Sequence, residues 1–293
     1  MKLNIKQNTP EWEEWRKELA GSASEAAIIM DCAPTWWDVS TKKMLREIKA
    51  GIRKRPPPTA ATQAAWDYGH AMEGPAREAA NKYLGMDFEP ACFEITSYGL
   101  RLGASLDGLD YEDDMKYGLE IKCPMTGDTS RTWRDASQLE ELLPHYYWQI
   151  IHQMAVADLD KVFFFVYLDD GRFYCSHVSK DTEAEDELWA AWREFNASLP
   201  VERTDDAWKM AASEYSYEKA QMAAHKQRME EAKKKMVGMA AGQDTYGSGS
   251  ILTHSKRRGS LSAASLLQLS GMSDEVAESA RGAPTDVVTV SGY

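Results

Sequence analysis

Hydrophobic and polar positions alternate over two short stretches in the middle of the chain, residues 102–109 and 118–124. This alternation, bounded by Gly, Asp and Pro, is typical of half-buried β-strands. The acidic residues between the two stretches are expected to form a solvated hairpin loop. A continuous apolar stretch over residues 162–168 predicts a buried strand, and residues 172–178 are its expected hairpin partner.

Apolar residues recur with helical spacing around these strands. Thr-Pro-Glu-Trp at residues 9–12 begins a helix that is expected to end at Gly21, and Ser22-Ala23-Ser24-Glu25 fits a capping box for a second helix. Gly69, inside an expected long helix, suggests a close approach to another backbone. Further helices are expected over residues 36–50, 59–84, 139–158, 180–199 and 206–241.

This order of elements predicts an α/β fold with a central mixed β-sheet flanked by helices. Three parts are expected along the chain. The core occupies residues 1–200, a helical extension follows over residues 201–241, and residues 242–293 form a flexible or weakly ordered tail.

The two central strands carry the candidate chemistry. Side chains alternate between the faces of a strand, so Glu120 and Lys122 share one face, and Asp107 joins them if the strands pair antiparallel. Two close carboxylates repel each other unless a proton or cation lies between them, and Mg²⁺ prefers hard oxygen ligands. The backbone carbonyl of Ile121 is a further candidate ligand. The alternative is a surface hairpin with an ordinary Glu–Lys ion pair.

Basic and hydroxyl side chains mark candidate phosphate contacts. The free backbone N–H groups at Ser22–Glu25 would form an anion pocket, with Arg16 as a second contact. The alternative is that the serines only cap the helix and the arginine is solvated. Arg53-Lys54-Arg55 either touches a DNA backbone or is a solvated loop, and Arg131 and Arg134 are further possible backbone contacts.

Composition narrows the class of protein. A formal net charge of −12 argues against a simple DNA-coating protein, because Lys and Arg supply most phosphate affinity. An enzyme with a local basic track remains compatible with that charge. The four cysteines are far apart, which disfavours zinc, iron–sulfur clusters and a disulfide framework. No apolar run reaches transmembrane length and the polar start is unlike a signal peptide, so a cytoplasmic protein without membrane contact is expected.

The two central stretches together resemble a known family. Gly103-Ala104-Ser105-Leu106-Asp107-Gly108-Leu109, followed by Leu119-Glu120-Ile121-Lys122-Cys123-Pro124, is similar to the core of the YqaJ-type viral recombinases. These are phage alkaline exonucleases related to lambda exonuclease, and they carry the D…(D/E)-x-K signature of a metal-dependent nuclease superfamily with a restriction-endonuclease-like core. The family usually has Pro before the Asp, where this chain has Leu106. That position sets a backbone preference and supplies no ligand.

The resemblance implies a third carboxylate and two metal ions. Trp66-x-x-Gly69-x-x-x-Glu73 resembles the family's helix that brings a carboxylate to the metals. Glu73 is therefore expected to bind Mg²⁺ or Mn²⁺ together with Asp107 and Glu120, with Asp107 as the bridge between two ions.

The resemblance also assigns residues on other helices. Tyr146-x-x-Gln149-x-x-x-Gln153 resembles the helix whose Gln lies beside the catalytic Lys122, and Gln149 is the preferred choice for that role. Thr-Pro-Glu-Trp…Arg…Ser-Ala-Ser resembles the family's opening motif. In the lambda enzyme the matching Arg and second Ser grip the DNA 5′-phosphate, which implies that contact for Arg16 and Ser24.

By this resemblance, the protein is expected to digest one strand of linear double-stranded DNA processively from 5′ to 3′. The 3′ overhang would serve a phage single-strand annealing protein, and a ring-shaped homo-oligomer, trimeric in the lambda enzyme, would enclose the DNA. The rival hypotheses are an endonuclease of restriction or repair type and a non-catalytic recombination scaffold. The intact set of Asp107, Glu120 and Lys122 disfavours the scaffold.

Overall fold

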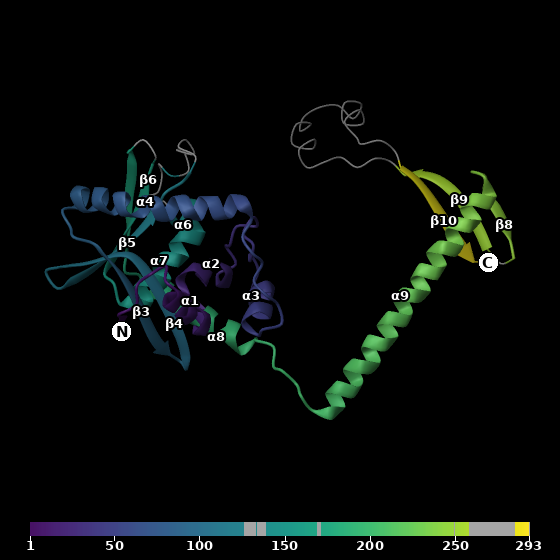
Figure 1. The fold of residues 1–293 in the computed structure, drawn as a ribbon, viewed down its shortest axis with the longest axis horizontal. Coiled ribbons are helices and arrows are strands. Elements are labelled where there is room, and N and C mark those ends of the chain that lie inside the picture. Colours follow the sequence, from purple (N-terminus) through teal and green to yellow (C-terminus); the bar gives the residue numbers. More distant parts are fainter. Residues whose placement is uncertain (126–132, 134–138, 169–170, 249, 258–284, 293) are drawn as a thin grey trace. The chain divides into compact units, whose positions relative to one another are not determined.

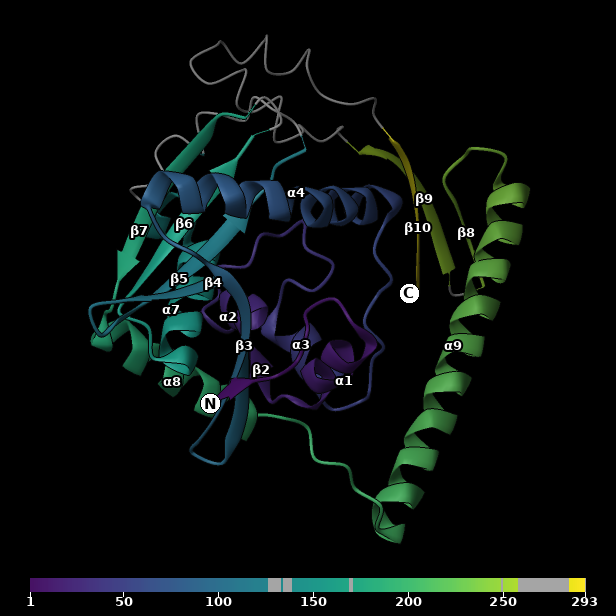
Figure 2. The ribbon, with the colours of Figure 1, turned by 60° about the vertical axis from the view of Figure 1, so that its left-hand side comes forward.

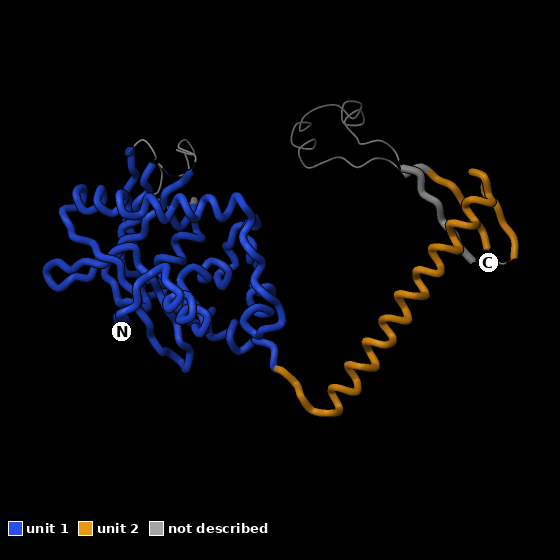
Figure 3. Tube along the Cα trace, in the orientation of Figure 1, with its two compact units in different colours: residues 1–201 blue, residues 202–293 orange. Residues whose placement is uncertain are grey.

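The structure is a computed structural model that describes residues 1–125, 133, 139–168, 171–248, 250–257 and 285–292 (Figure 1). Arg131 and Arg134, expected as backbone contacts, lie outside the described residues. The chain forms two compact units, residues 1–201 and residues 202–293 (Figure 3).

A mixed seven-stranded sheet forms the centre of the first unit, in the order β1-β3-β4-β5-β6-β7, with the short β2 beside β4. β5 and β6 pair in parallel, as do β2 and β4, whereas the other neighbours are antiparallel. The expected central mixed sheet is therefore confirmed. Its strands are β1 Lys2–Leu3, β2 Gly21–Ser22, β3 Glu89–Ser97, β4 Leu100–Glu112, β5 Met115–Lys122, β6 Lys161–Tyr167 and β7 Phe173–Ser179.

Helices cover both faces of this sheet (Figures 1 and 2). On one face α4 lies against β4, β5 and β6, and its Ala76 and Ala80 pack in a small core with Leu119 and Ile121. On the other face α7, together with α2 and α8, encloses the main core. The helices of this unit are α1 Pro10–Glu18, η1 Ala23–Glu25 (a 3₁₀ turn), α2 Ala26–Ile29, α3 Lys42–Lys49, α4 Ala60–Leu84, α6 Leu139–Leu142, α7 Pro144–Ala157 and α8 Thr182–Ala197.

Local chemistry sets the ends of the long helix α4. The Thr59 hydroxyl accepts a hydrogen bond from the Thr62 backbone N–H at 3.1 Å, which caps the first turn. Gly85 ends the helix with a φ of +72°, a left-handed conformation that costs glycine little. These bounds confirm the expected helix. Apart from its own helix, however, none of the described residues has an atom within 4 Å of the position that a Cβ of Gly69 would take, so the expected close backbone approach there is wrong.

Other boundaries differ from the sequence expectation. Only Lys42–Lys49 of the expected helix over residues 36–50 is helical. The expected helix over residues 139–158 is divided at Leu143, because Pro144 favours a first helical position and donates no backbone hydrogen bond. Gly21 does not end the first helix but lies in β2, where a Cβ would come within 2.2 Å of the Trp192 ring.

The second unit contains the long helix α9 (Asp206–Ala240) and a three-stranded antiparallel sheet in the order β10-β9-β8. The helix agrees with the expected helical extension. The strands β8 (Thr245–Gly247), β9 (Ser250–Arg257) and β10 (Thr285–Gly292) lie where a linker and a weakly patterned tail were expected. Pairing of β9 with β10 joins segments far apart in the chain, which local sequence does not reveal. Within the described residues, no helix is both long and apolar enough to span a bilayer.

Candidate active site

A β-bulge in β4 places Asp107. Ala91 of β3 pairs with Leu106, but Glu89 pairs with Leu109, so β4 has one more residue than β3 in this interval. Such a bulge re-aims side chains and is common beside active sites. Here the Asp107 carboxylate turns toward the neighbouring strand, and its Oδ2 accepts a hydrogen bond from the Ile121 backbone N–H at 2.7 Å. The bulge thus brings a carboxylate to the end of β5, the strand that carries Glu120 and Lys122.

Glu120 is a buried carboxylate, 3% exposed, on the α7 face of the sheet. Two glutamines of α7 donate hydrogen bonds to it, Gln149 Nε2 to Oε1 at 2.6 Å and Gln153 Nε2 to Oε2 at 2.6 Å. Lys122 Nζ also pairs with Oε1. Hydrogen bonds to an ionised group are among the stronger ones in proteins, so this set fixes the position of the carboxylate. Gln149 therefore lies where the sequence predicted it, beside the lysine and its glutamate.

Lys122 ends β5 and carries the ammonium group of the site. Its Nζ lies 4.8 Å from the centroid of the Tyr146 ring, in addition to its pairing with Glu120. Burial alone lowers the pKa of Lys122, but the negative charges of Glu120 and Asp107 outweigh burial and raise it. The side chain is therefore a fixed cation at neutral pH.

Glu73 approaches from α4 and is held by an arginine one turn further along the helix. Arg77 Nη2 pairs with Glu73 Oε1 at 2.8 Å, and Arg77 Nε donates to the Asp107 backbone carbonyl, also at 2.8 Å. One guanidinium thus joins the helix to the bulged strand. Burial, followed by the charges of Glu120 and Glu73, raises the pKa of the Asp107 carboxyl well above its ordinary value. Asp107 therefore lies within electrostatic reach of both other carboxylates.

The donor atoms suit a hard divalent cation, since carboxylate and carbonyl oxygens are the ligands that Mg²⁺ and Mn²⁺ prefer. Burial, followed by the charges of Glu120 and Glu73, raises the pKa of Asp107, and a cation beside it would relieve the repulsion between these carboxylates. The side chains are nevertheless engaged with each other: Glu120 with Lys122 and the two glutamines, and Glu73 with Arg77. In the part of the chain that the structure describes, no three His, Cys, Asp or Glu side chains are arranged to hold a metal ion. The chemistry of the set fits the ion, but its present arrangement is not a finished coordination shell.

The two predicted phosphate contacts also lie together. Arg16 Nη2 donates to Ser24 Oγ at 2.8 Å, and the Arg16 guanidinium lies over the Trp12 ring, 4.5 Å from its centroid. Ser22 also forms the predicted capping box with Glu25, so one of the two serines caps the helix. β2 pairs Ser22 with Gly103 of β4, four residues before Asp107. At about 3.3 Å per residue, Gly103, beside the predicted phosphate contacts, lies about 13 Å along β4 from Asp107 of the carboxylate site.

Sequence reasoning did not assign two residues that the structure brings into the site. Gln153 was the weaker choice beside Gln149, yet it is fully buried and bound directly to Glu120. Arg77 received no role, although its spacing of four from Glu73 on one helix was a readable signal for an ion pair. Its bond to the Asp107 carbonyl depends on the tertiary packing of α4 on β4 and had no local signal.

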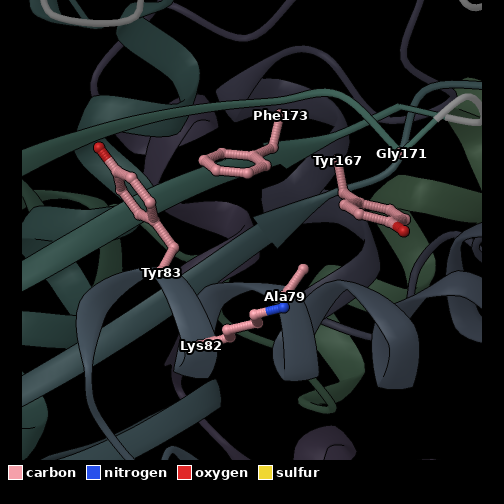
Figure 4. Close-up of a pocket in the computed structure, with 6 residues that line it drawn as sticks. All are labelled: Ala79, Lys82, Tyr83, Tyr167, Gly171 and Phe173. Atoms are coloured by element: carbon pink, nitrogen blue, oxygen red, sulfur yellow. The ribbon is translucent and has the colours of Figure 1, made fainter.

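A hollow of about 420 Å³ lies further along α4, beyond the carboxylates (Figure 4). Its wall is formed by the last turns of α4 and by the ends of β6 and β7, and the residues that line it are Ala79, Lys82, Tyr83, Tyr167, Gly171 and Phe173. None of the predicted site residues lines it. We therefore place the candidate chemistry at the bulge of β4 and the carboxyl end of β5 rather than in this hollow.

Comparison with known proteins gives a family match over the same segments. Residues 11–160, half of the chain, match the sequence model of the YqaJ-like viral recombinase domain. This range contains every residue of the candidate site described above. None of the curated proteins compared matches the chain.

Solved structures provide the comparison of folds. The chain is similar to an alkaline exonuclease, LHK-Exo, from Laribacter hongkongensis, with 24% identity and a TM-score of 0.51, over 73% of this chain and 100% of that one. The structure of LHK-Exo in complex with dAMP matches at 25% identity and a TM-score of 0.49, over 72% and 99%. A phage related exonuclease from Haemophilus somnus 129PT matches at 13% identity and a TM-score of 0.44, over 59% and 92%. The first of these similarities supports the shared fold.

Proposed function

Because the chain belongs to the family of YqaJ-like viral recombinase domains, we propose that it is a deoxyribonuclease, an exonuclease that digests one strand of linear double-stranded DNA. The observation that carries this proposal is the convergence of Asp107, Glu120 and Lys122 where the bulge of β4 adjoins the carboxyl end of β5. Burial, followed by repulsion from Glu120 and Glu73, raises the pKa of the aspartate there, and a structural hairpin has no need for such an arrangement.

Asp107, Glu120, Glu73 and the backbone carbonyl of Ile121 would hold Mg²⁺ or Mn²⁺, as two ions per site. When bound, such ions supply Lewis-acid activation of the phosphodiester and lower the pKa of a bound water. Lys122 offsets negative charge that develops on the phosphate, because it remains charged and is fixed by Glu120 and the Tyr146 ring. Gln149 and Gln153 orient Glu120 through hydrogen bonds to both of its oxygens.

Arg16 and Ser24 are proposed to bind the 5′-phosphate of the DNA end, which sets digestion from 5′ to 3′. The product is a duplex with a 3′ overhang, suited to a single-strand annealing protein. A ring-shaped homo-oligomer, as in the lambda enzyme, would enclose the DNA. These finer features rest on kinship with the family, and the hydrogen bond between Arg16 and Ser24 supports the phosphate contact alone.

The test is digestion of end-labelled linear duplex beside closed circular DNA, with Mg²⁺ and with a chelator. An exonuclease degrades the linear DNA only when Mg²⁺ is present, and it leaves the circle intact. Nicking of the circle would instead identify an endonuclease of the same superfamily. If both substrates remain intact with Mg²⁺, the protein is a non-catalytic scaffold and the proposal is wrong. The E120Q variant is the matched control, because it removes a proposed ligand with little change of shape.

A further inference from the structure

A buried carboxylate pairs with two basic side chains beside the predicted phosphate contacts. Glu25 is 6% exposed, yet it pairs with Lys49 Nζ at 3.0 Å and with Arg55 Nη2 at 2.9 Å. The backbone N–H and the hydroxyl of Ser22 also donate to its Oε2, each at 3.2 Å. Burial alone raises the pKa of Glu25, but the positive charges of Lys49 and Arg55 outweigh burial and lower it. Glu25 is therefore an ionised anchor for two basic side chains.

This anchor is continuous with Arg16 and Ser24. Ser22 Oγ, which bonds Glu25, lies 3.3 Å from Ser24 Oγ, and Ser24 Oγ accepts from Arg16. Burial lowers the pKa of the Arg16 guanidinium, and the like charge of Arg55 lowers it further. The negative charge of Glu25 acts in the opposite direction and raises the same pKa. Arg55 is thus close enough to Arg16 for the two guanidinium groups to repel each other across the cluster.

Lys49 and Arg55, the two cations paired with Glu25, differ in how many of their N–H donors remain available to a ligand. Lys49 is largely enclosed, and its ammonium also donates to the Leu19 carbonyl at 3.1 Å, so its donors serve the fold. Arg55 uses one nitrogen on Glu25, and 54% of its side chain is exposed. A guanidinium has five N–H donors, which leaves a face of Arg55 open to a ligand. The basic cluster at residues 53–55 therefore has one member fixed at the pocket.

The charges of the cluster favour a dianion. Lys49 and Arg55 pair with Glu25, and Arg16 joins the cluster through Ser24, so three positive charges share one carboxylate and two of them have no partner inside the cluster. A terminal phosphate monoester carries a charge of about −1.5 to −2 at neutral pH, with three acceptor oxygens. An internal phosphodiester carries a single charge. Two guanidinium groups in one cluster therefore favour a phosphorylated DNA end over an internal phosphate or a hydroxyl end.

We propose that Arg55, held in place by Glu25, is a second guanidinium that binds the 5′-terminal phosphate together with Arg16 and Ser24. Arg55 contacts the ligand, and Glu25 is a positioning residue that acts through it. This inference rests on the proposed function, since it extends the phosphate pocket of that function. The proposed role applies to Arg55 and not to Arg53, because the guanidinium of Arg53 pairs with Glu47.

The test measures binding without divalent cations, so that no cleavage is needed. Fluorescence anisotropy compares duplexes with a 5′-phosphate and with a 5′-hydroxyl for the full-length wild type, R55A, R16A and K54A. Lys54 is the matched control, because it is the adjacent residue of the same basic cluster. Loss of a charge-assisted contact is expected to reduce the preference of R55A for the phosphorylated end by about 10- to 100-fold. K54A should keep the preference of the wild type.

A purely structural role of Arg55 would weaken binding of both duplexes equally, so the ratio of the two affinities isolates the specific contact. R55K should restore part of the ratio, because lysine keeps the charge but cannot hold Glu25 and a phosphate together as a guanidinium does. If wild type prefers the phosphate and R16A loses the preference while R55A retains it, this inference is overturned and the pocket of Arg16 and Ser24 stands. If wild type shows no preference, both are overturned.

Digestion rates on the same duplexes with Mg²⁺ separate this inference from the nuclease proposal. Binding that depends on Arg55 without any digestion would refute the nuclease function and leave the phosphate site intact. Digestion with an unchanged ratio of rates on phosphorylated and hydroxyl ends in R55A would refute the phosphate contact and leave the nuclease function intact.

Discussion

Gln153 offers a sharp test of how the site is held, and we predict that Gln153→Leu lowers both stability and activity. The side chain is fully buried and donates to Glu120 Oε2 at 2.6 Å and to the Ser105 carbonyl at 3.1 Å, while its own Oε1 has no partner among the described residues. Leucine has a similar size, so the variant removes hydrogen bonds without opening a large cavity. The effect of the substitution therefore measures the polar contacts.

The expected magnitude follows from three opposing contributions. Loss of the bond to the ionised Glu120 costs about 1.5–3 kcal/mol, and loss of the bond to the Ser105 carbonyl costs about 1 kcal/mol. Removal of the unpaired Oε1 returns about 1–3 kcal/mol, because a buried acceptor without a partner is itself unfavourable. The net loss of unfolding free energy is on the order of 1–2 kcal/mol. At about 2–4 °C per kcal/mol for a unit of this size, the melting temperature should fall by about 2–8 °C.

The assay combines calorimetric unfolding with initial rates on linear duplex DNA. Gln63→Leu is the matched control, because Gln63 also donates to a carboxylate, Asp67, but at the surface of α4. It should change stability by less than about 0.5 kcal/mol. A misplaced Glu120 should reduce the rate by about 100-fold in Q153L. Combining Q153L with E120Q should give effects that are smaller than additive, since both act on one contact.

Unchanged melting and unchanged rates in Q153L would refute the reasoning, because the amide would then not hold Glu120. Strictly additive losses in the double variant would also refute it. They would show that Gln153 stabilises the fold by a route that does not pass through the carboxylate.

Three further predictions concern other parts of the first unit. Gly21→Ala should lower the unfolding free energy by about 3 kcal/mol in denaturant titration, because its Cβ would lie 2.2–2.6 Å from carbons of the buried Trp192 ring; a midpoint as high as that of Gly69→Ala, at an open helix position, would contradict this. Burial lowers the pKa of His152 to about 4, so the folded protein keeps it neutral while the unfolded chain takes up a proton below about pH 6.5. Stability should therefore fall by up to about 3 kcal/mol as pH drops from 6.5 to 4, and H152Q should lose this part of the decline; an identical pH profile in H152Q would argue against it. Burial and then the charges of Glu120 and Glu73 raise the pKa of Asp107, so D107N should melt at a higher temperature than wild type without metal and lose digestion by at least about 100-fold. Mg²⁺ should raise the melting temperature of wild type but not of D107N; a lower metal-free melting temperature in D107N would count against the repulsion.

Much of the local structure could be predicted because its causes are local. Thr59 caps α4 and Gly85 ends it, and both signals are readable within a few residues. The continuous apolar run of β6 is buried on both faces of the sheet, as its composition indicated. The placement of Glu120 and Lys122 on one strand follows from the period of two. Where a neighbouring segment decided the outcome, as at Gly21 against Trp192, the local expectation was wrong.

The sequence by itself determined the acidic and basic side chains of the central hairpin that meet at the site, and its resemblance to the family implied the glutamate of α4 and Gln149 of α7. Only the tertiary structure decided how they are held. The bulge that turns Asp107 toward Ile121 depends on the register of β3 against β4. The bond of Arg77 to the Asp107 carbonyl and that of Arg55 to Glu25 each join residues 30 positions apart. Periodicity and capping act over one or two turns, whereas these contacts arise from packing between elements, and a single sequence carries no local record of them.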